Sequence, residues 1–326
     1  MMLLPPSGRN IGLDLVRATE AAALTAARWI GRGDAEAADQ AATQAMFEAL
    51  NSIDFRGHIA VGEEDKLGIH SPLDTFKTVG TGQGPEMDVV VDAIDGAKLL
   101  MHGRSGALAV AAAAPQGSIW MPKPAVYMEK LVVDREVVPA LVSECLDAPV
   151  AWTLALISRL KKKAIPDLVV FMLERARHEE LMEETRAAGA RVWLRGDGDI
   201  SGALLAATPH SGVDLMIGVG GVTEGLIASC GIKALGGGML GRLAPQTPEE
   251  RAAVEAAGLE TKKILQCNEF VTSNEIFVAV TGITNGALLP GVKYSRGLVE
   301  THSMILRAET RTRRFIHSEH LIGRLQ

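Results

Sequence analysis

The spacing of hydrophobic residues changes along the chain, and each spacing predicts a different kind of element. Between residues 13 and 30, apolar and small side chains recur at intervals of three or four, which predicts an amphipathic helix leading into a loop over residues 31–39. Similar spacing predicts helices at 178–188 and 248–258, whereas short continuous apolar runs are typical of buried strands. Such runs cover residues 58–61, 88–92, 106–113, 167–172, 190–194, 213–219 and 275–281. This alternation predicts an α/β fold in which helical layers cover the sheets.

One interruption of the pattern suggests a domain boundary. Asp147, Ala148 and Pro149 separate two stretches that each alternate strands with helices. We therefore expect an N-terminal part over residues 1–150 and a C-terminal part over residues 151–326, with one integrated unit as the alternative.

Acidic residues follow one of the predicted strands directly. The run Val89–Val91 continues into Asp92 and Asp95, and Gly96 comes next. A carboxylate that leaves a buried strand must be paired, solvated or bound to a cation, and Mg²⁺ and Mn²⁺ prefer oxygen ligands. The alternative is a strand that ends in an ordinary Asp-Gly turn.

Three further segments place acids after apolar elements. Gly31–Asp34 leads to Asp39, the strand at 58–61 precedes Gly62–Asp65, and the strand at 213–219 precedes Gly220–Glu224. Any one of them could be a solvated loop, but their recurrence favours a site built from several carboxylates.

In their sequences and in their order along the chain, these segments resemble the class II fructose-1,6-bisphosphatases. That family lies within the larger group of metal-dependent sugar and inositol phosphatases. The similarity extends from Thr19 to about Arg314. It is carried by Trp29–Asp34, Val79–Gly82, Asp92–Gly96, Tyr127–Leu131, Arg177–His178, Asp197–Asp199, Gly220–Gly221 with Glu224, Gly241–Leu243 and Thr281–Thr284. The resemblance implies a layered sugar-phosphatase fold, a cytoplasmic hydrolase of carbohydrate metabolism and gluconeogenesis, and a homo-oligomer, either dimer or tetramer.

The resemblance also implies a reaction and a set of residues for it. Water would attack the 1-phosphate of fructose 1,6-bisphosphate, a small-molecule sugar phosphate, with Mg²⁺ or Mn²⁺ as cofactor. The metal ligands would be Asp39, Glu63, Asp92, Asp95 and Glu224, and the catalytic residues Asp65 and Asp95. Substrate contacts would come from Gly96, Ala97, Tyr127, Arg175, Arg177, Asp197, Gly198, Asp199 and Gly221. Taken without the resemblance, Arg177 could be a surface arginine paired with acids, and Asp197–Asp199 could be a turn that caps a helix.

The chain departs from the family pattern where chemistry is expected. Asp95 stands where the family has Glu, and Ala97 replaces the threonine whose hydroxyl would orient the attacking water. Ala35 replaces a lysine, Glu64 fills a glycine position, and Gly236–Leu240 lacks three polar side chains. Losing one orienting group typically costs on the order of 10²- to 10³-fold in rate. The alternative is therefore a diverged relative with weak or no activity that binds a phosphorylated sugar or regulates another protein.

Composition excludes several other classes. The 326 residues are 47% hydrophobic and only 4% aromatic, and the net charge is −6. Because the only basic clusters are Lys161–Lys163 and Arg311–Arg314, we expect no nucleic-acid partner. No apolar run is long enough to span a membrane and no leader pattern is seen, so we expect no membrane partner and a cytoplasmic location. The three cysteines fit reduced thiols. His317 and His320 are a weak alternative metal pair, since on a helix they could share a face.

Overall fold

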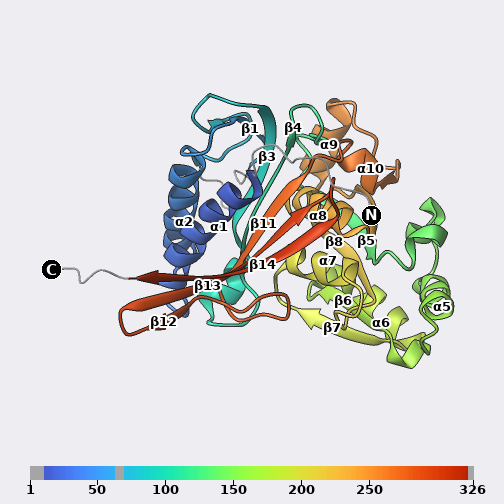
Figure 1. Ribbon diagram of the computed structural model, residues 1–326. Helices are drawn as coiled ribbons and strands as arrows, with labels where there is room; N and C mark the ends of the chain where they lie inside the picture. The colour runs from blue at the N-terminus through green and yellow to red at the C-terminus, as the bar shows by residue number, and fades with distance from the viewer. Residues whose placement is uncertain (1–10, 63–69, 322–326) are drawn as a thin grey trace, which may run out of the picture. The chain divides into compact units, whose positions relative to one another are not determined.

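The computed structural model describes residues 11–62 and 70–321, which form two compact units (Figure 1). Unit 1 combines the chain up to Ser118 with the chain from Ser273 onward, and unit 2 is Ile119–Thr272. Residue 150, where the sequence suggests a boundary, is the first residue of a helix inside unit 2. Both units mix helices with sheets, which confirms the predicted α/β class.

Unit 1 is built on an eight-stranded sheet in the order β12-β13-β11-β4-β3-β1-β2, with β14 paired to β13. Helices α1 and α2 pack on this sheet through small side chains such as Ala22 and Ala42, which allow close approach. The strands are β1 (Arg56–Val61), β2 (Thr78–Val79), β3 (Glu86–Asp95), β4 (Leu108–Pro115), β11 (Phe277–Gly282), β12 (Lys293–Ser295), β13 (Leu298–Arg307) and β14 (Thr312–Leu321). The helices are α1 (Ile11–Ala27), α2 (Ala35–Leu50) and α4 (Ala97–Met101).

Unit 2 is built on a six-stranded sheet in the order β10-β9-β5-β8-β6-β7. Its strands are β5 (Tyr127–Val133), β6 (Val169–Leu173), β7 (Arg191–Arg195), β8 (Leu215–Gly221), β9 (Gly238–Leu243) and β10 (Leu265–Gln266). Its helices are α5 (Val150–Lys161), α6 (Glu179–Ala187), α7 (Asp199–Ala207), α8 (Val222–Leu235), α9 (Pro248–Ala256) and α10 (Cys267–Phe270), with short 3₁₀ turns η1 (Val138–Ala140), η2 (Ser143–Leu146), η3 (Ile165–Asp167) and η4 (Ala176–His178).

Helices cover both faces of the unit 2 sheet. On β6, Val170 and Met172 belong to the core cluster that includes α5, while Phe171 points the other way and lies against Gly202 of α7. A strand buried on both faces reads as a continuous apolar run in the sequence. That is why β6 was predictable from hydrophobicity alone.

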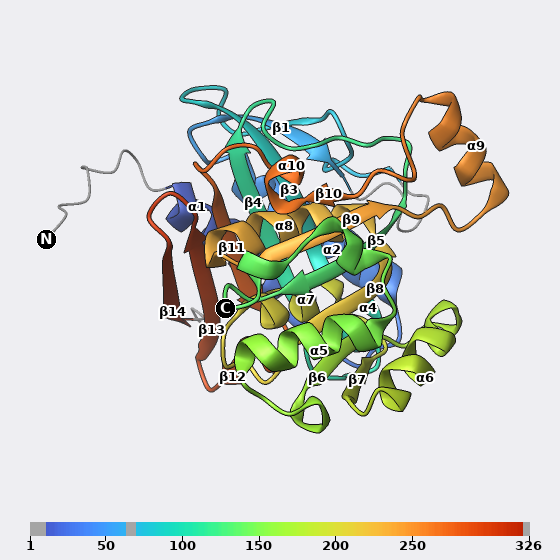
Figure 2. The ribbon, with the colours of Figure 1, turned by 90° about the vertical axis from the view of Figure 1, so that its right-hand side faces the viewer.

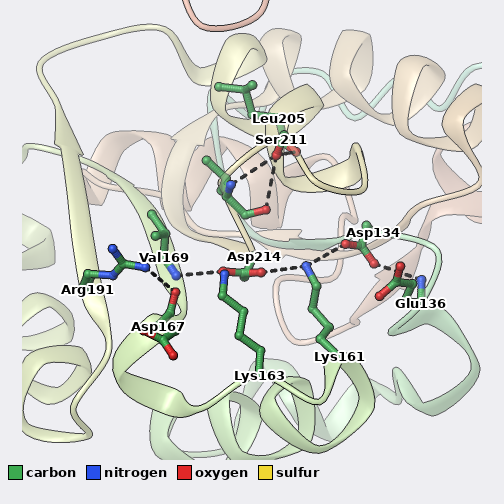
Figure 3. Close-up of polar contacts among 11 residues, drawn as sticks. Asp134, Glu136, Lys161, Lys163, Asp167, Val169, Arg191, Leu205, Ser211 and Asp214 are labelled. Atoms are coloured by element: carbon green, nitrogen blue, oxygen red, sulfur yellow. Dashed lines mark hydrogen bonds and ion pairs between the residues drawn. The ribbon is translucent and has the colours of Figure 1, made fainter.

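A buried ionic network ties the end of α5 to the ends of three strands of unit 2, β5, β6 and β8 (Figure 3). Lys161 Nζ lies 2.8 Å from Asp134 Oδ2 and 2.7 Å from Asp214 Oδ1. Asp214 Oδ2 also lies 2.5 Å from Lys163 Nζ and accepts a hydrogen bond from Val169 N–H. Since Asp214 comes immediately before β8, the network fixes the start of the strand whose far end carries Gly221.

Every strand and helix predicted from the hydrophobic pattern is present, with ends shifted by a few residues. The loop expected over residues 31–39 is wrong in its second half. Helix α2 begins at Ala35, because the Asp34 carboxylate accepts a hydrogen bond from Ala37 N–H at 3.0 Å and so caps the helix. Asp39 therefore lies on a helix. Strand β3 also extends to Asp95, so Asp92 and Asp95 lie within the strand and not after it.

Candidate functional site

In unit 1, Asp92 and Asp95 are both buried near the end of β3. Three residues apart on a regular strand, they would point to opposite faces. The register with β4 shifts between them, however, so that Asp92 is opposite Val110 and Asp95 is opposite Leu108. Because paired residues of neighbouring strands share a face, and Val110 and Leu108 are two positions apart, this bulge brings both aspartates to one face of the sheet.

A hydrogen bond and a glycine turn fix the backbone around these two acids. Asp92 Oδ1 accepts a hydrogen bond from Ile94 N–H at 3.1 Å. Gly96 has a φ of 91°, a left-handed conformation that favours glycine, and the chain then turns into α4 at Ala97. The Ala97 methyl group packs against the unit 1 core. A hydroxyl at this position would therefore be held on a fixed helix start.

The other predicted residues of unit 1 have different settings. Asp39 is half-buried on α2, and Ala35 lies one turn before it on the same helix face. Glu63 and Asp65 lie outside the described residues. Over residues 11–62 and 70–321, no group of three or more His, Cys, Asp or Glu side chains is arranged to hold a metal ion. Asp92 and Asp95 do offer buried carboxylate oxygens on one face, the donor type that fits Mg²⁺ or Mn²⁺.

In unit 2, the two predicted arginines lie beside the end of β8. Arg177 donates from Nε and Nη2 to the carbonyl oxygen of Val219, at 3.3 and 3.0 Å, and its guanidinium group stacks 5.2 Å from the centre of the Tyr127 ring. Arg175 donates to the carbonyl oxygen of Gly196 and lies 3.4 Å from Asp197 Oδ1. Partial burial and the positive charge of Arg175 lower the pKa of Arg177, although the Tyr127 side chain opposes this. Both guanidinium groups are therefore held in place before any ligand binds.

His178 fixes the backbone that Arg177 uses. Its Nδ1 lies 2.7 Å from the carbonyl oxygen of Leu173, and its Nε2 accepts a hydrogen bond from Val219 N–H at 2.8 Å. Burial lowers the pKa of His178, and the adjacent Arg177 charge lowers it further, which agrees with a neutral ring that donates from Nδ1. Residue Val219 is thus bound at its N–H by His178 and at its carbonyl by Arg177.

A buried ion pair lies beneath this arginine pair. Lys130 is 0% exposed, and its Nζ donates to Asp199 Oδ2 and, at 3.3 Å, to the carbonyl oxygen of Gly221. Lys130 lies opposite Gly218 on β8 and opposite Gly241 on β9, so neither neighbouring strand places a side chain against it. Lys130 was not predicted as a site residue, because the pairing that opposes it to two glycines is not visible in the sequence.

One carboxylate oxygen of Asp199 accepts no hydrogen bond within the described part of the chain. Burial raises the pKa of Asp199, the charges of Glu224 and Asp197 raise it further, and Lys130 opposes them. Its Oδ1 is buried and accepts no hydrogen bond from any residue that the structure describes. An oxygen in that position is suited to accept a hydrogen bond from a ligand hydroxyl.

Glycines allow the acids of unit 2 to approach the backbone. A Cβ at Gly220 would lie 2.0 Å from Asp199 Oδ2, and one at Gly221 would lie 1.9 Å from Glu224 Oε2. Gly198 has a φ of 95° and precedes α7, so Asp199 is the first residue of that helix. The sequence alternative of a turn that caps a helix is therefore correct only in part, because α7 does begin at Asp199 but its N-cap residue is Gly198 and no side chain caps it.

Glu250 was also missed by the sequence analysis. From α9, its Oε1 accepts hydrogen bonds from Val126 N–H at 2.8 Å and Tyr127 N–H at 2.9 Å, and its Oε2 accepts one from Gln246 N–H. These bonds fix the start of β5, where Tyr127 stacks on Arg177. The signal was Thr247 with Glu250 three residues later, a helix-start pattern that does not reveal its long-range partners.

The departure at Gly236–Gly238 lies away from this cluster. Gly236 ends α8 with a φ of 75°, at the opposite end of the helix from Glu224 and about 18 Å along its axis. A Cβ at Gly238 would lie 2.7 Å from the Leu141 side chain, and Leu240 is part of the unit 2 core. At Gly238 and Leu240, packing takes the place of the missing polar side chains, whereas Gly236 is exposed.

Comparisons with known proteins agree over almost the whole chain. The family model described as bacterial fructose-1,6-bisphosphatase, glpX-encoded, matches residues 9–320. The D-fructose 1,6-bisphosphatase class 2/sedoheptulose 1,7-bisphosphatase of Synechococcus sp. (strain JA-3-3Ab) is 33% identical over 96% of each chain. The fructose-1,6-bisphosphatase class 2 of Haemophilus influenzae is 36% identical over 97% of this chain and 98% of that protein. The extragenic suppressor protein suhB of Bartonella henselae aligns at a TM-score of 0.34 and 14% identity over 61% of this chain and 72% of that chain, too weakly to carry an argument. No helix within the described residues is long and apolar enough to cross a membrane.

Proposed function

This chain belongs to the family of bacterial, glpX-encoded fructose-1,6-bisphosphatases, and from that membership we propose that it hydrolyses the 1-phosphate of fructose 1,6-bisphosphate with water as the nucleophile. The single observation that carries the proposal is the match over residues 9–320. Mg²⁺ or Mn²⁺ as cofactor and a place in cytoplasmic carbohydrate metabolism belong to the same proposal. Sedoheptulose 1,7-bisphosphate is a second candidate substrate, because the name of the Synechococcus relative includes it.

Unit 2 supplies the groups that would bind the sugar phosphate. Arg177 uses Nε and Nη2 on Val219, and its Nη1 makes no hydrogen bond to any described residue. That N–H group and the neighbouring Arg175 would donate to phosphate oxygens, since guanidinium groups match phosphate geometry. Asp199 Oδ1 would accept a sugar hydroxyl, and Lys130 would hold the carboxylate in place. This arrangement would orient the substrate and exclude poses in which the sugar is reversed.

Unit 1 supplies the groups that would act at the reacting phosphate. Asp92 and Asp95 would hold the metal, with Asp39 and Glu63 as further candidate ligands from this unit, and Glu224 is the candidate ligand from unit 2. A divalent ion supplies charge neutralisation and lowers the pKa of bound water. Asp65 and Asp95 remain the candidates for moving the proton. With Ala97 in place of threonine, the chain has no side-chain hydroxyl at that position to orient the water, so we expect slow turnover.

The decisive experiment measures phosphate release from fructose 1,6-bisphosphate with Mg²⁺ or Mn²⁺. We expect release that requires the metal, stops on chelation and is lost in Asp92→Ala. Phosphorus NMR of the products should show fructose 6-phosphate and no fructose 1-phosphate, which tests the position of cleavage separately from activity.

The same assay separates the alternative of a non-catalytic binding protein, which the comparisons do not favour. If calorimetry shows that fructose 1,6-bisphosphate binds, but no phosphate is released with either metal, catalysis is rejected and the binding alternative stands. Release that persists unchanged in Asp92→Ala would reject the proposed role of Asp92.

A further inference from the structure

Strand β14 forms an open edge of the unit 1 sheet. Over its whole length, Thr312–Leu321, it pairs on one side with β13, from Arg307 opposite Thr312 to Leu298 opposite Leu321. No strand of the described residues pairs with its other side, and Figure 2 shows β14 in dark red at the margin of the sheet, beyond β13. A long, straight edge strand is a template for pairing with another chain.

The two faces of β14 differ in character. On one face, Ile316 packs against the unit 1 core, and His320 Nε2 lies 2.9 Å from Thr301 Oγ1. On the other face, the side chains are exposed, and two of them are large and apolar: Phe315 is 61% exposed and Leu321 is 86% exposed. The exposed face follows the odd-numbered positions Arg313, Phe315, His317, Glu319 and Leu321.

We propose that β14 pairs antiparallel with β14 of a second copy of this chain, about a two-fold axis at Ile316, and so joins two unit 1 sheets into one. Directly opposed residues must share a face, so their numbers must add to an even sum. With the axis at Ile316, Arg313 of each copy is opposite Glu319 of the other, and Phe315 is opposite His317. Two ion pairs and two aromatic pairs then form by symmetry.

The two neighbouring registers pair the charged side chains of β14 less favourably. An axis at His317 would place Phe315 opposite Glu319 and Arg314 opposite His320, and an axis at Phe315 would place Arg313 opposite His317. Neither gives Arg313 an acidic partner from within β14. Charge complementarity therefore selects Ile316 as the centre.

Contacts within the chain leave Glu319 and Arg313 available for this role. Glu319 lies opposite Glu300 of β13, an unfavourable like-charge pair, and Glu300 is already engaged by Lys293 and His317. Within the described residues Glu319 makes no ion pair, and the one contact of the Arg313 guanidinium group is with the Phe315 ring, 5.2 Å from its centre. An arginine from a second copy would neutralise Glu319 and offset the repulsion from Glu300.

Sedimentation equilibrium of the full chain tests the proposal through a charge-swap cycle. We expect a reversible association step whose dissociation constant rises roughly tenfold or more in Arg313→Glu and in Glu319→Arg, because each change turns two attractions into two repulsions. The double variant R313E/E319R restores both pairs with reversed sign and should return the constant to near its starting value. Glu255→Arg, an exposed charge reversal on α9, is the matched control and should leave association unchanged.

Cysteine cross-linking tests the register. The three native cysteines are buried and do not compete. Under mild oxidation, an equimolar mixture of Phe315→Cys and His317→Cys should form a disulfide-linked dimer in higher yield than either variant alone, because residue 315 of one copy is opposite residue 317 of the other.

Four results would overturn the proposal. A chain that is monomeric up to its solubility limit has no such interface. Association that neither single charge reversal weakens uses another surface. Weakening that the double variant does not reverse, or cross-linking that is strongest in a single variant, places β14 in a different register.

Discussion

The two units differ in how much of the family pattern they keep. Unit 2 retains each side chain that the resemblance assigns to the sugar phosphate, and the structure gathers Tyr127, Arg175 and Arg177 at the end of β8, above the Lys130–Asp199 pair. Unit 1 carries Asp95 and Ala97 at the end of β3 and Ala35 beside Asp39. The unit 2 residues proposed to bind the sugar phosphate are therefore all present, while several unit 1 positions proposed to act on the phosphate differ from the family pattern.

This contrast is sharper in the structure than in the sequence. The departure at Gly236–Gly238 falls in unit 2, but it begins at the far end of α8 from Glu224 and removes nothing from the arginine cluster. If the proposed function is correct, changes in unit 2 should alter KM and stability, and changes in unit 1 should alter kcat.

The largest effect on stability is expected from Lys130→Met in unit 2. The substitution leaves the Asp199 carboxylate buried without its cation, which should lower the free energy of unfolding by about 3–5 kcal/mol. In the natural chain the Lys130 charge opposes the burial that raises the pKa of Asp199, so its removal raises that pKa further and the folded variant keeps a proton that the unfolded chain releases as the pH rises. The loss should therefore be small in acid and grow as the pH rises, as measured by urea unfolding at several pH values.

The double variant K130M/D199N is the control for this pair. Removing both charges should recover most of the stability, since no ion is then left buried. If the free energy of unfolding of Lys130→Met falls by less than about 1 kcal/mol, the ion pair contributes little to stability. The proposed difference between unit 2 and unit 1 would then lose this support.

Arg177→Met should act on substrate affinity. Methionine is also a long, unbranched side chain, but the substitution removes the N–H donors and the guanidinium charge that stacks on Tyr127, so we expect KM for fructose 1,6-bisphosphate to rise between about tenfold and 10²-fold. We expect kcat to change much less. Arg186→Gln, on the exposed side of α6, is the matched control and should leave both constants unchanged. A fall in kcat at constant KM would assign Arg177 to the chemical step. It would contradict the proposal that unit 2 binds the substrate while unit 1 carries out the chemistry.

Asp214→Asn tests the network that fixes the start of β8. Burial alone would raise the pKa of Asp214, but hydrogen bonds from Lys161, Lys163 and Val169 N–H outweigh it and hold the pKa below the ordinary value of 3.8. The network therefore contributes stability above about pH 3.8 that is lost as the pH falls through the folded-state pKa. We expect Asp214→Asn to cost about 2 kcal/mol at neutral pH, with the difference from the natural chain closing in acid. Parallel acid-unfolding curves for the two chains would contradict this.

Among the strands, the sequence predicted those that are apolar throughout and missed those whose character comes from their neighbours. Strands β3 and β6 are buried on both faces and read as continuous runs. Strand β14 largely alternates exposed and partly buried positions and has no continuous apolar run, so its histidines suggested a helix face. That interpretation is wrong, because His317 and His320 lie on opposite faces of a strand.

The candidate site was predictable only in part for the same reason. The order of the motifs along the sequence was enough to propose Arg175, Arg177, Asp197 and Asp199, and the structure gathers them in unit 2. Nothing in the sequence indicated Lys130, because that lysine is buried only where glycines lie opposite it on both neighbouring strands. The bulge that brings Asp92 and Asp95 to one face is also a property of strand pairing, not of either strand alone.

Ala97→Thr tests the contrast from the side of unit 1 and has the smallest expected effect. The new hydroxyl would be held at the start of α4, and if it orients the attacking water we expect kcat to rise about tenfold while KM stays constant. Ala97→Val is the matched control, because valine has the shape of threonine without the hydroxyl. A gain in threonine alone would identify the missing group as an orienting one. If the two variants have the same kcat and the natural chain already turns over rapidly, another group orients the water. Unit 1 would then have compensated for its departures from the family pattern.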